Sequence, residues 1–220
     1  MTFSILARDP ETGALGGASA TGSLCVGGWV LRGDSRAGMT ASQGAAPSTM
    51  WGEDTLELMR DGMSAADAVA HVTGADSGNE WRQLAALDRR GHVASHTGRQ
   101  NTEWHGSIEQ DELVVVGNLL SSGDVLEALR DAYLAAAGGL SARLLAALAA
   151  GEAAGGDVRG LQSAALLIVS DNRPPLTLRI DWAEQPVLAL FDLHQRSQTG
   201  EYATWLERVP TRRNPSLSLK

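Results

Sequence analysis

The sequence contains one cysteine and one lysine, and the lack of more excludes several kinds of chemistry. Because Cys25 is the only cysteine among 220 residues, the chain cannot form an internal disulfide or a cysteine-based zinc site. Lys220 is the last residue, so no lysine lies within the fold for Schiff-base catalysis. Aromatic residues make up only 5%, whereas 25 glycines and clustered alanines indicate close packing of the backbone.

Positive charge and long apolar runs are also scarce. The net charge is -8, and phosphate binding needs clustered cations, so we expect no nucleic-acid partner. No apolar run approaches the roughly 20 residues of a membrane span, and the N-terminus lacks the basic segment of a secretory signal. The glycine-rich stretch 13–28 has neither phosphate-loop nor dinucleotide spacing. We therefore expect a cytoplasmic protein that contacts no membrane and needs no cofactor.

Apolar runs and turn residues predict the elements of secondary structure. We expect strands or extended runs at residues 2–7, 14–21, 25–31, 38–43, 82–88, 92–97, 112–117, 163–169 and 176–182. Helical periodicity and capping residues predict helices at residues 48–60, 65–71, 124–137, 140–153, 186–195 and 202–209.

The order of these elements predicts an α+β fold. Helices grouped between sets of antiparallel strands indicate two stacked sheets with helical layers outside them. No repeat or linker divides the chain, so we expect one domain over residues 1–210 and a frayed tail over residues 211–220.

Thr2 is the first candidate for catalysis. Removal of the initiator Met1 before a small second residue would make Thr2 the terminal residue, with its hydroxyl and its α-amine side by side. An α-amine has a pKa of about 7.7–8.0, so part of it is neutral at pH 7 and can accept the hydroxyl proton. The alternative is that Thr2 simply opens the first strand, and since very many proteins begin Met-Thr, the sequence alone favours this alternative.

Two motifs resemble a known family. The opening MTFSILARD of residues 1–9, with the turn that leads to residues 13–16, and AAGGDVRGLQSAAL of residues 153–166 resemble the bacterial domain of unknown function family 1028 over nearly the whole chain. The resemblance implies the four-layer αββα fold of the N-terminal nucleophile hydrolases, the superfamily of proteasome subunits and glycosylasparaginases. It implies a reaction only by analogy.

The superfamily's pattern implies roles for individual residues. Thr2 matches the nucleophile, and Gly44 matches the glycine whose amide donates to the oxyanion. Asn118, after Gly117, occupies the place of the turn that supports the terminal amine. Asp157 and Ser163 match an acid followed by a hydroxyl residue, although at a longer spacing.

One departure separates the chain from proteasome-type sites. These sites place a lysine beside the nucleophile, and the nearest match here is Arg32, which can stabilise an anion but cannot cycle a proton. A peptidase relay is therefore not expected. The manner of glycosylasparaginases, which relies on the terminal amine and on hydroxyl neighbours such as Ser19 and Thr21, suits the sequence better.

Two further groups have alternative interpretations. Asp157, Arg159 and Gln162 could bind a substrate carboxylate, with Arg159 as a bidentate clamp, or could tie a loop to a strand. His92 and His96 could bind a metal with His105 or Glu103, but no close pair such as His-x-His supports this, and a structural role is favoured. We expect no metal. Cys25 lacks a nearby histidine, and an inert buried thiol is expected.

These observations predict an N-terminal nucleophile amidohydrolase that acts on a small amide or amino-acid-derived substrate. Thr2 would attack the carbonyl, and Gly44 with Asn118 would hold the oxyanion or the amine. The alternative is a catalytically silent protein of the same fold that binds a small ligand or a partner protein. An acidic, alanine-rich chain also makes a homo-oligomer plausible.

Overall fold

A computed structural model describes residues 2–101 and 104–218. The strands are β1 (Thr2–Arg8), β2 (Leu15–Thr21), β3 (Leu31–Asp34), β4 (Gly38–Gly44), β5 (Arg82–Asp88), β6 (Val93–Thr97), β7 (Trp104–Gln110), β8 (Leu113–Leu120), β9 (Ser163–Val169) and β10 (Leu176–Ile180). The helices are α1 (Val26–Trp29), α2 (Thr49–Arg60), α3 (Ala65–Gly74), α4 (Asp124–Ala135), α5 (Leu140–Ala153), α6 (Pro186–Ser197) and α7 (Gly200–Leu206), with a short 3-10 turn at Asn79–Trp81.

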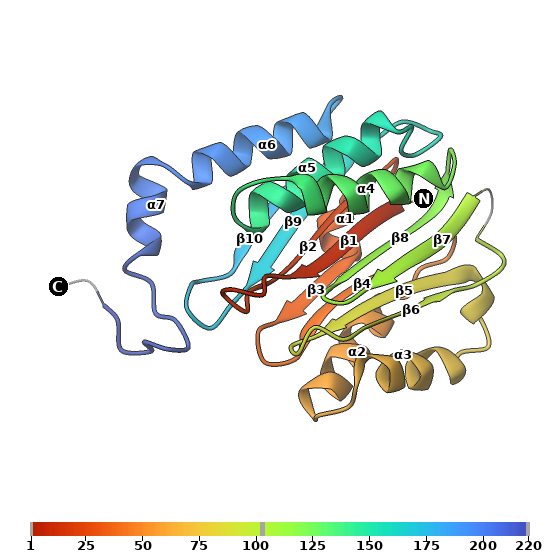
Figure 1. Cartoon of the computed structure of the whole chain (residues 1–220), viewed down its shortest axis with the longest axis horizontal. Coiled ribbons are helices and arrows are strands. Elements are labelled where there is room, and N and C mark those ends of the chain that lie inside the picture. Colours follow the sequence, from red (N-terminus) through yellow and green to blue (C-terminus); the bar gives the residue numbers. More distant parts are fainter. Residues whose placement is uncertain (1, 102–103, 219–220) are drawn as a thin grey trace.

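The strands form two antiparallel sheets, as the sequence predicts (Figure 1). The larger sheet has the order β10-β9-β2-β1-β8-β7, so β1 lies in its interior between β2 and β8. The smaller sheet has the order β3-β4-β5-β6. The hairpin β1–β2 closes through Asp9, whose carboxylate accepts the N–H groups of Glu11 and Thr12, and through Gly13 at φ 71°.

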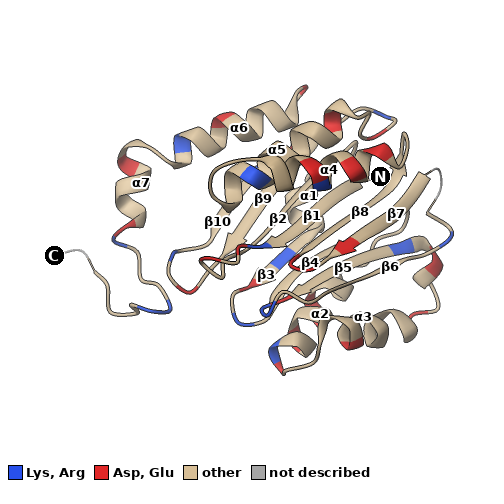
Figure 2. Cartoon of the chain, viewed as in Figure 1, with Lys and Arg blue, Asp and Glu red and all other residues tan. Residues whose placement is uncertain are grey.

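Three apolar clusters hold four layers together. The first lies between the larger sheet and α4, α5 and α6, the second between the two sheets, and the third between the smaller sheet and α2 and α3. Since both faces of each sheet are covered, the central strands β1, β2 and β4 are buried except at the last residues of β1 and β4. Figure 2 shows the charged residues mostly on the outer helices and loops. In the described part of the chain, no helix is long and apolar enough to cross a bilayer.

Alternation along β1 divides its side chains between two layers. Phe3, Ile5 and Ala7 pack under the helices, whereas Leu6 packs between the sheets. Because strand side chains alternate, Thr2 and Ser4 point to the same side as Leu6. The space between the sheets is therefore apolar at one end of β1 and polar at the end where β1 begins.

The local structure differs from the expectations at two places. Residues 25–31 are not one extended run, because α1 occupies Val26–Trp29: the Val26 N–H is bound by the Ser163 hydroxyl at 3.1 Å, and Cys25 adopts a left-handed conformation. The strand β7 was not predicted, because its side chains are mostly exposed or half-buried and show no apolar alternation. Near the chain end, Arg212 donates to the Ser35 hydroxyl and pairs with Asp34.

Candidate active site

A buried cluster of polar side chains fills the space between the sheets where β1 begins. A polar group away from water is costly unless it is hydrogen-bonded, so such a cluster needs an explanation. It draws on five strands, and its members are Thr2 and Ser4 of β1, Ser19 and Thr21 of β2, Gln43 of β4, Gln83 of β5 and Asn118 of β8.

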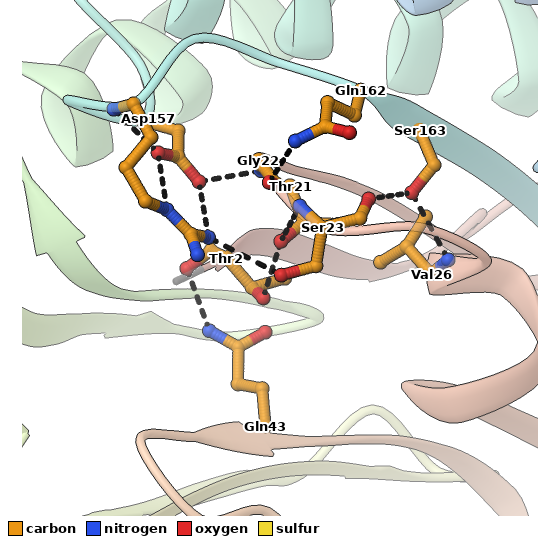
Figure 3. A network of polar contacts seen from close by, with 10 residues as sticks. Thr2, Thr21, Gly22, Ser23, Val26, Gln43, Asp157, Gln162 and Ser163 are labelled. Carbon is orange, nitrogen blue, oxygen red and sulfur yellow. Dashed lines mark hydrogen bonds and ion pairs between the residues drawn. The ribbon is translucent and has the colours of Figure 1, made fainter. Parts of the chain in front are cut away.

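Thr2 is held by groups from both sheets. Its side chain donates to the Thr21 hydroxyl at 3.2 Å, and its carbonyl oxygen accepts from the Gln43 amide at 2.9 Å. Only 6% of Thr2 is exposed. Figure 3 shows Thr2 between Gln43 on one side and the chain segment 21–26 on the other. Two residue pairs further along β1, the hydroxyls of Ser4 and Ser19 lie 2.7 Å apart.

Gln83 connects the two sheets through its side-chain amide. Its nitrogen donates to the Thr97 hydroxyl and to the carbonyl oxygens of Gly106 and Gly117, at 2.9–3.0 Å. Its oxygen accepts from the amides of Gln43 and Asn118, at 2.7 and 3.1 Å. If the amide were flipped, its oxygen would face two carbonyl oxygens, so the hydrogen-bond network itself determines the orientation of the Gln83 amide.

Asn118 carries a buried side-chain atom that is left without a hydrogen-bond partner among the residues that the structure describes. Because it must present its NH2 group to Gln83, its Oδ1 atom points elsewhere, and this buried oxygen has no hydrogen-bond partner within the described residues. A buried acceptor without a partner costs about 1–3 kcal/mol. Asn118 lies directly opposite Thr2 in the pairing of β1 with β8. The next residue, Leu119, has φ 57°, a strained conformation that is concentrated at functional sites.

Gly44 follows Gln43 at the end of β4. An added Cβ would lie 2.7 Å from the Trp81 carbonyl oxygen, and φ is 131°, so only glycine fits. The Ser42 N–H donates to Val30 O at 3.1 Å. Since alternate N–H groups of a strand point the same way, the Gly44 N–H points to that side too, beyond the first residue of β3. It therefore points away from β5, which pairs with the other edge of β4.

Asp157 and Arg159 fix the segment that follows β2. The buried Asp157 carboxylate accepts the Gly22 N–H and the Arg159 N–H, and the Arg159 guanidinium binds it at 3.1 and 3.2 Å. The same guanidinium donates to the Ser23 hydroxyl at 3.3 Å. Because one edge of the Arg159 fork is already occupied by Asp157, the arrangement favours the loop-tying role over a preformed clamp for a substrate carboxylate.

Gln162, which precedes β9, and Ser163, the first residue of β9, bind the same segment after β2. The Gln162 amide donates to Gly22 O at 2.7 Å, and the Ser163 hydroxyl donates to Ser23 O at 2.7 Å while it accepts from Val26 N–H (Figure 3). Ser163 also lies opposite Thr21 in the sheet. Both residues thus position Thr21, which in turn contacts Thr2.

Arg32 does not lie beside Thr2, contrary to the expectation. It points to the outer face of the smaller sheet, where it pairs with Glu53 of α2 at 3.2 Å and donates to Leu31 O. The physical reason is strand alternation, because Leu31 occupies the face between the sheets and Arg32 must therefore occupy the other.

The histidines are dispersed. His92 pairs with Asp88, and the His96 ring packs edge-on against Trp51, whereas His105 belongs to the other sheet. Glu103 lies outside the described residues. Among those that are described, no group of three or more His, Cys, Asp or Glu could hold a metal.

Gln43 and Gln83 are the site residues that the sequence analysis missed. Each carries a detectable signal, because each continues the alternating series that faces the other sheet, Gln43 after Met39 and Ala41, and Gln83 before Ala85 and Leu87. A long polar side chain at a position where the pattern requires an apolar one is typical of a functional site.

Comparison with known proteins gives a family and a structural relative. A family model described as a family of unknown function (DUF1028) matches residues 2–190. The crystal structure of protein SPO2555 from Silicibacter pomeroyi, which is assigned to the same family, is 53% identical, with a TM-score of 0.96; the match covers 100% of this chain and 96% of that one. None of the curated proteins matches.

Proposed function

Since the chain belongs to the family of unknown function DUF1028, its reaction must be argued from its own site, and we propose that it is an N-terminal nucleophile amidohydrolase. The nucleophile is Thr2, which becomes the terminal residue when Met1 is removed. The substrate is a small amide or an amino-acid-derived compound.

The observation that carries the proposal is the Asn118 Oδ1 atom opposite Thr2, which has no hydrogen-bond partner among the described residues. Removal of Met1 converts the Thr2 backbone nitrogen from an amide into an amine, which gains donors that the unprocessed chain lacks. An amine at that end of β1 supplies the hydrogen-bond donor that the buried Asn118 Oδ1 lacks. Asn118 then orients the amine toward the Thr2 hydroxyl, as a base must be oriented toward its nucleophile.

The chemistry proceeds in two steps. The Thr2 hydroxyl oxygen attacks the amide carbonyl carbon while the α-amine takes the hydroxyl proton, and the Gly44 N–H donates to the developing oxyanion. The amine then passes the proton to the leaving nitrogen, the C–N bond breaks, and an ester on Thr2 remains. Water, deprotonated by the same amine, hydrolyses this ester and frees the hydroxyl.

The fold supports the proposal by analogy. The chain has four layers in the order helices, sheet, sheet and helices, and a threonine begins an interior strand that faces the second sheet. Members of the N-terminal nucleophile superfamily have this arrangement. The absence of lysine other than Lys220 and the position of Arg32 argue against a proteasome-like relay. A glycosylasparaginase-like site, with the Thr21 and Ser19 hydroxyls near the nucleophile, fits better.

A covalent trap tests the proposal. The native protein is incubated with a β-lactone, which acylates a reactive hydroxyl, and the intact mass and the peptide that bears the adduct are measured by mass spectrometry. We expect Met1 to be absent and the adduct to lie on Thr2. Complete retention of Met1 on protein that reacts, or an adduct confined to other residues, would overturn the mechanism.

Two matched variants separate catalysis from binding. Both Val and Ser at position 2 permit removal of Met1; Thr2→Val keeps the shape but lacks the hydroxyl, and Thr2→Ser keeps the hydroxyl. We expect adduct formation to be lost in the first and kept in the second. If all three proteins bind small amides equally and none forms an adduct, the catalytically silent ligand-binding alternative holds instead.

A further inference from the structure

A groove of about 960 Å³ lies at the end of the larger sheet that is remote from Thr2. It is bounded by the β1–β2 turn, the start of α5, the β9–β10 loop, the end of α6, α7 and the chain end up to Leu217. β1 begins at Thr2, and Asp9 of the groove follows its last residue, so the groove is about 23 Å from Thr2 along the strand. Its volume is that of a site for a small molecule.

Much of this groove is built by residues that the family model does not match. The model ends at residue 190, whereas the end of α6, α7 and the tail follow it. The tail keeps its place because Arg212 binds Ser35 and the Arg213 N–H donates to Asp171 O. The groove therefore needs an explanation separate from that of the Thr2 site.

Ser141 of α5 and His194 of α6 form a hydrogen-bonded pair on the wall of the groove. The Ser141 hydroxyl and His194 Nε2 lie 2.9 Å apart, within the distance required between a nucleophile and its base. Burial lowers the pKa of His194 below its usual value, which favours the neutral ring. With the proton on Nδ1, Nε2 accepts from the Ser141 hydroxyl.

The start of α5 adds donors beside this serine. Gly139 precedes the helix and supplies no side-chain cap, so the N–H groups of Leu140, Ser141 and Ala142 have no acceptor within the helix. The helix dipole further favours negative charge at this end. All three residues line the groove, so these N–H groups lie near the point where an oxyanion on a substrate bound to Ser141 would form.

We propose that the groove is a second reactive site, with Ser141 as nucleophile and His194 as general base, acting on carboxylic esters with an apolar acyl group. The Ser141 oxygen attacks the ester carbonyl carbon, and its proton passes to His194 Nε2. The C–O bond to the alcohol breaks as the imidazolium returns the proton to the leaving oxygen. Water, with His194 again as base, hydrolyses the acyl-serine, so that one ester and one water give one acid and one alcohol.

The surroundings decide the substrate class. Leu140, Ile168, Leu176, Leu206 and Leu217 line the groove and favour an apolar acyl chain. Within the described residues, no carboxylate is bonded to His194, so the pair lacks the third group that orients a stronger base. An ester, whose leaving oxygen needs less assistance than an amide nitrogen, is therefore the appropriate substrate.

The test uses p-nitrophenyl butyrate as the substrate and a fluorophosphonate as the covalent probe, with the full chain. We expect the wild type to hydrolyse the ester and to be labelled on Ser141, and Ser141→Ala to lose both. Ser64→Ala is the matched control, because Ser64 also starts a helix but faces Asp67 instead of an imidazole. It should keep the wild-type rate. Label on Thr2 and not on Ser141 would overturn this proposal and leave the proposed function standing.

His194→Ala tests the base. General-base assistance contributes about 10²–10⁴-fold, so we expect at least a 10²-fold loss of kcat/KM. Added imidazole should restore part of the rate in His194→Ala but not in the double variant with Ser141→Ala, a difference that a merely structural histidine would not produce. If circular dichroism shows that either variant is unfolded, the rate at which iodoacetamide alkylates Ser141→Cys tests the proposal instead. A cysteine beside a base should react faster than Cys25. Equal reaction would overturn the proposal.

Discussion

Gln83 offers the most direct test of the polar network between the sheets. Gln83→Met keeps the length and the approximate volume of the side chain but removes both its donor and its acceptor. The carbonyls of Gly106 and Gly117 lose a donor, and the Asn118 amide loses its acceptor, whereas Gln43 keeps its bond to the Thr2 carbonyl.

The expected cost follows from these losses. A buried polar group left without its partner costs about 1–3 kcal/mol. The bonds of Gln83 to the Gly117 carbonyl and to the Asn118 amide are fully buried, so these two losses lower the free energy of unfolding by about 2–6 kcal/mol. This is a large share of the roughly 5–15 kcal/mol by which proteins are stable. For a chain of this size, it corresponds to a fall in Tm of roughly 4–24 °C.

Urea denaturation followed by circular dichroism measures the loss, with Gln110→Met as the control because Gln110 is exposed at the end of β7. The control should change the free energy of unfolding by less than about 0.5 kcal/mol. If Gln83→Met is equally harmless, the five hydrogen bonds of Gln83 do not hold the sheets together, and the argument for the orientation of Asn118 fails with them.

Two further predictions concern other parts of the chain. Gly22→Ala places a Cβ about 2.5 Å from the buried Asp157 carboxylate, so it should lower the free energy of unfolding by about 1–3 kcal/mol. Gly74→Ala is the control and should not lower it, because a Cβ there meets nothing within 4 Å. Equal free energies of unfolding for the two variants in urea would contradict this prediction. Burial opposes ionisation of Asp34, but hydrogen bonds from Arg36 and Arg60 outweigh it and hold the pKa of Asp34 well below its usual range. The resulting stability is present above the unfolded pKa of about 3.9 and is lost as the pH falls toward the folded pKa, so the Tm of Asp34→Asn should fall less than that of the wild type between pH 5 and pH 2. Parallel Tm curves would show that the ion pairs contribute nothing.

The candidate site was predictable in part. Thr2, Ser19, Thr21 and Asn118 do meet, because β1 pairs with β2 and β8 in registers that place Thr2 opposite both Thr21 and Asn118. Arg32 does not join them, because its position depends on which face of β3 packs against the larger sheet. The choice between a carboxylate clamp and a loop tie at Asp157 depended on the course of the chain around Gly22, which no local pattern contains.

The sequence by itself determined what depends on neighbouring residues. Alternation and turn residues predicted the first hairpin and helical periodicity predicted α2, α4 and α5, since these patterns act over a few residues. The composition by itself excluded disulfide and lysine chemistry. Only the tertiary structure decided which distant groups meet: Gln83 with Asn118, and Ser141 with His194, 53 positions apart. Such contacts depend on strand register and on the packing of helices, and neither is encoded in any single segment.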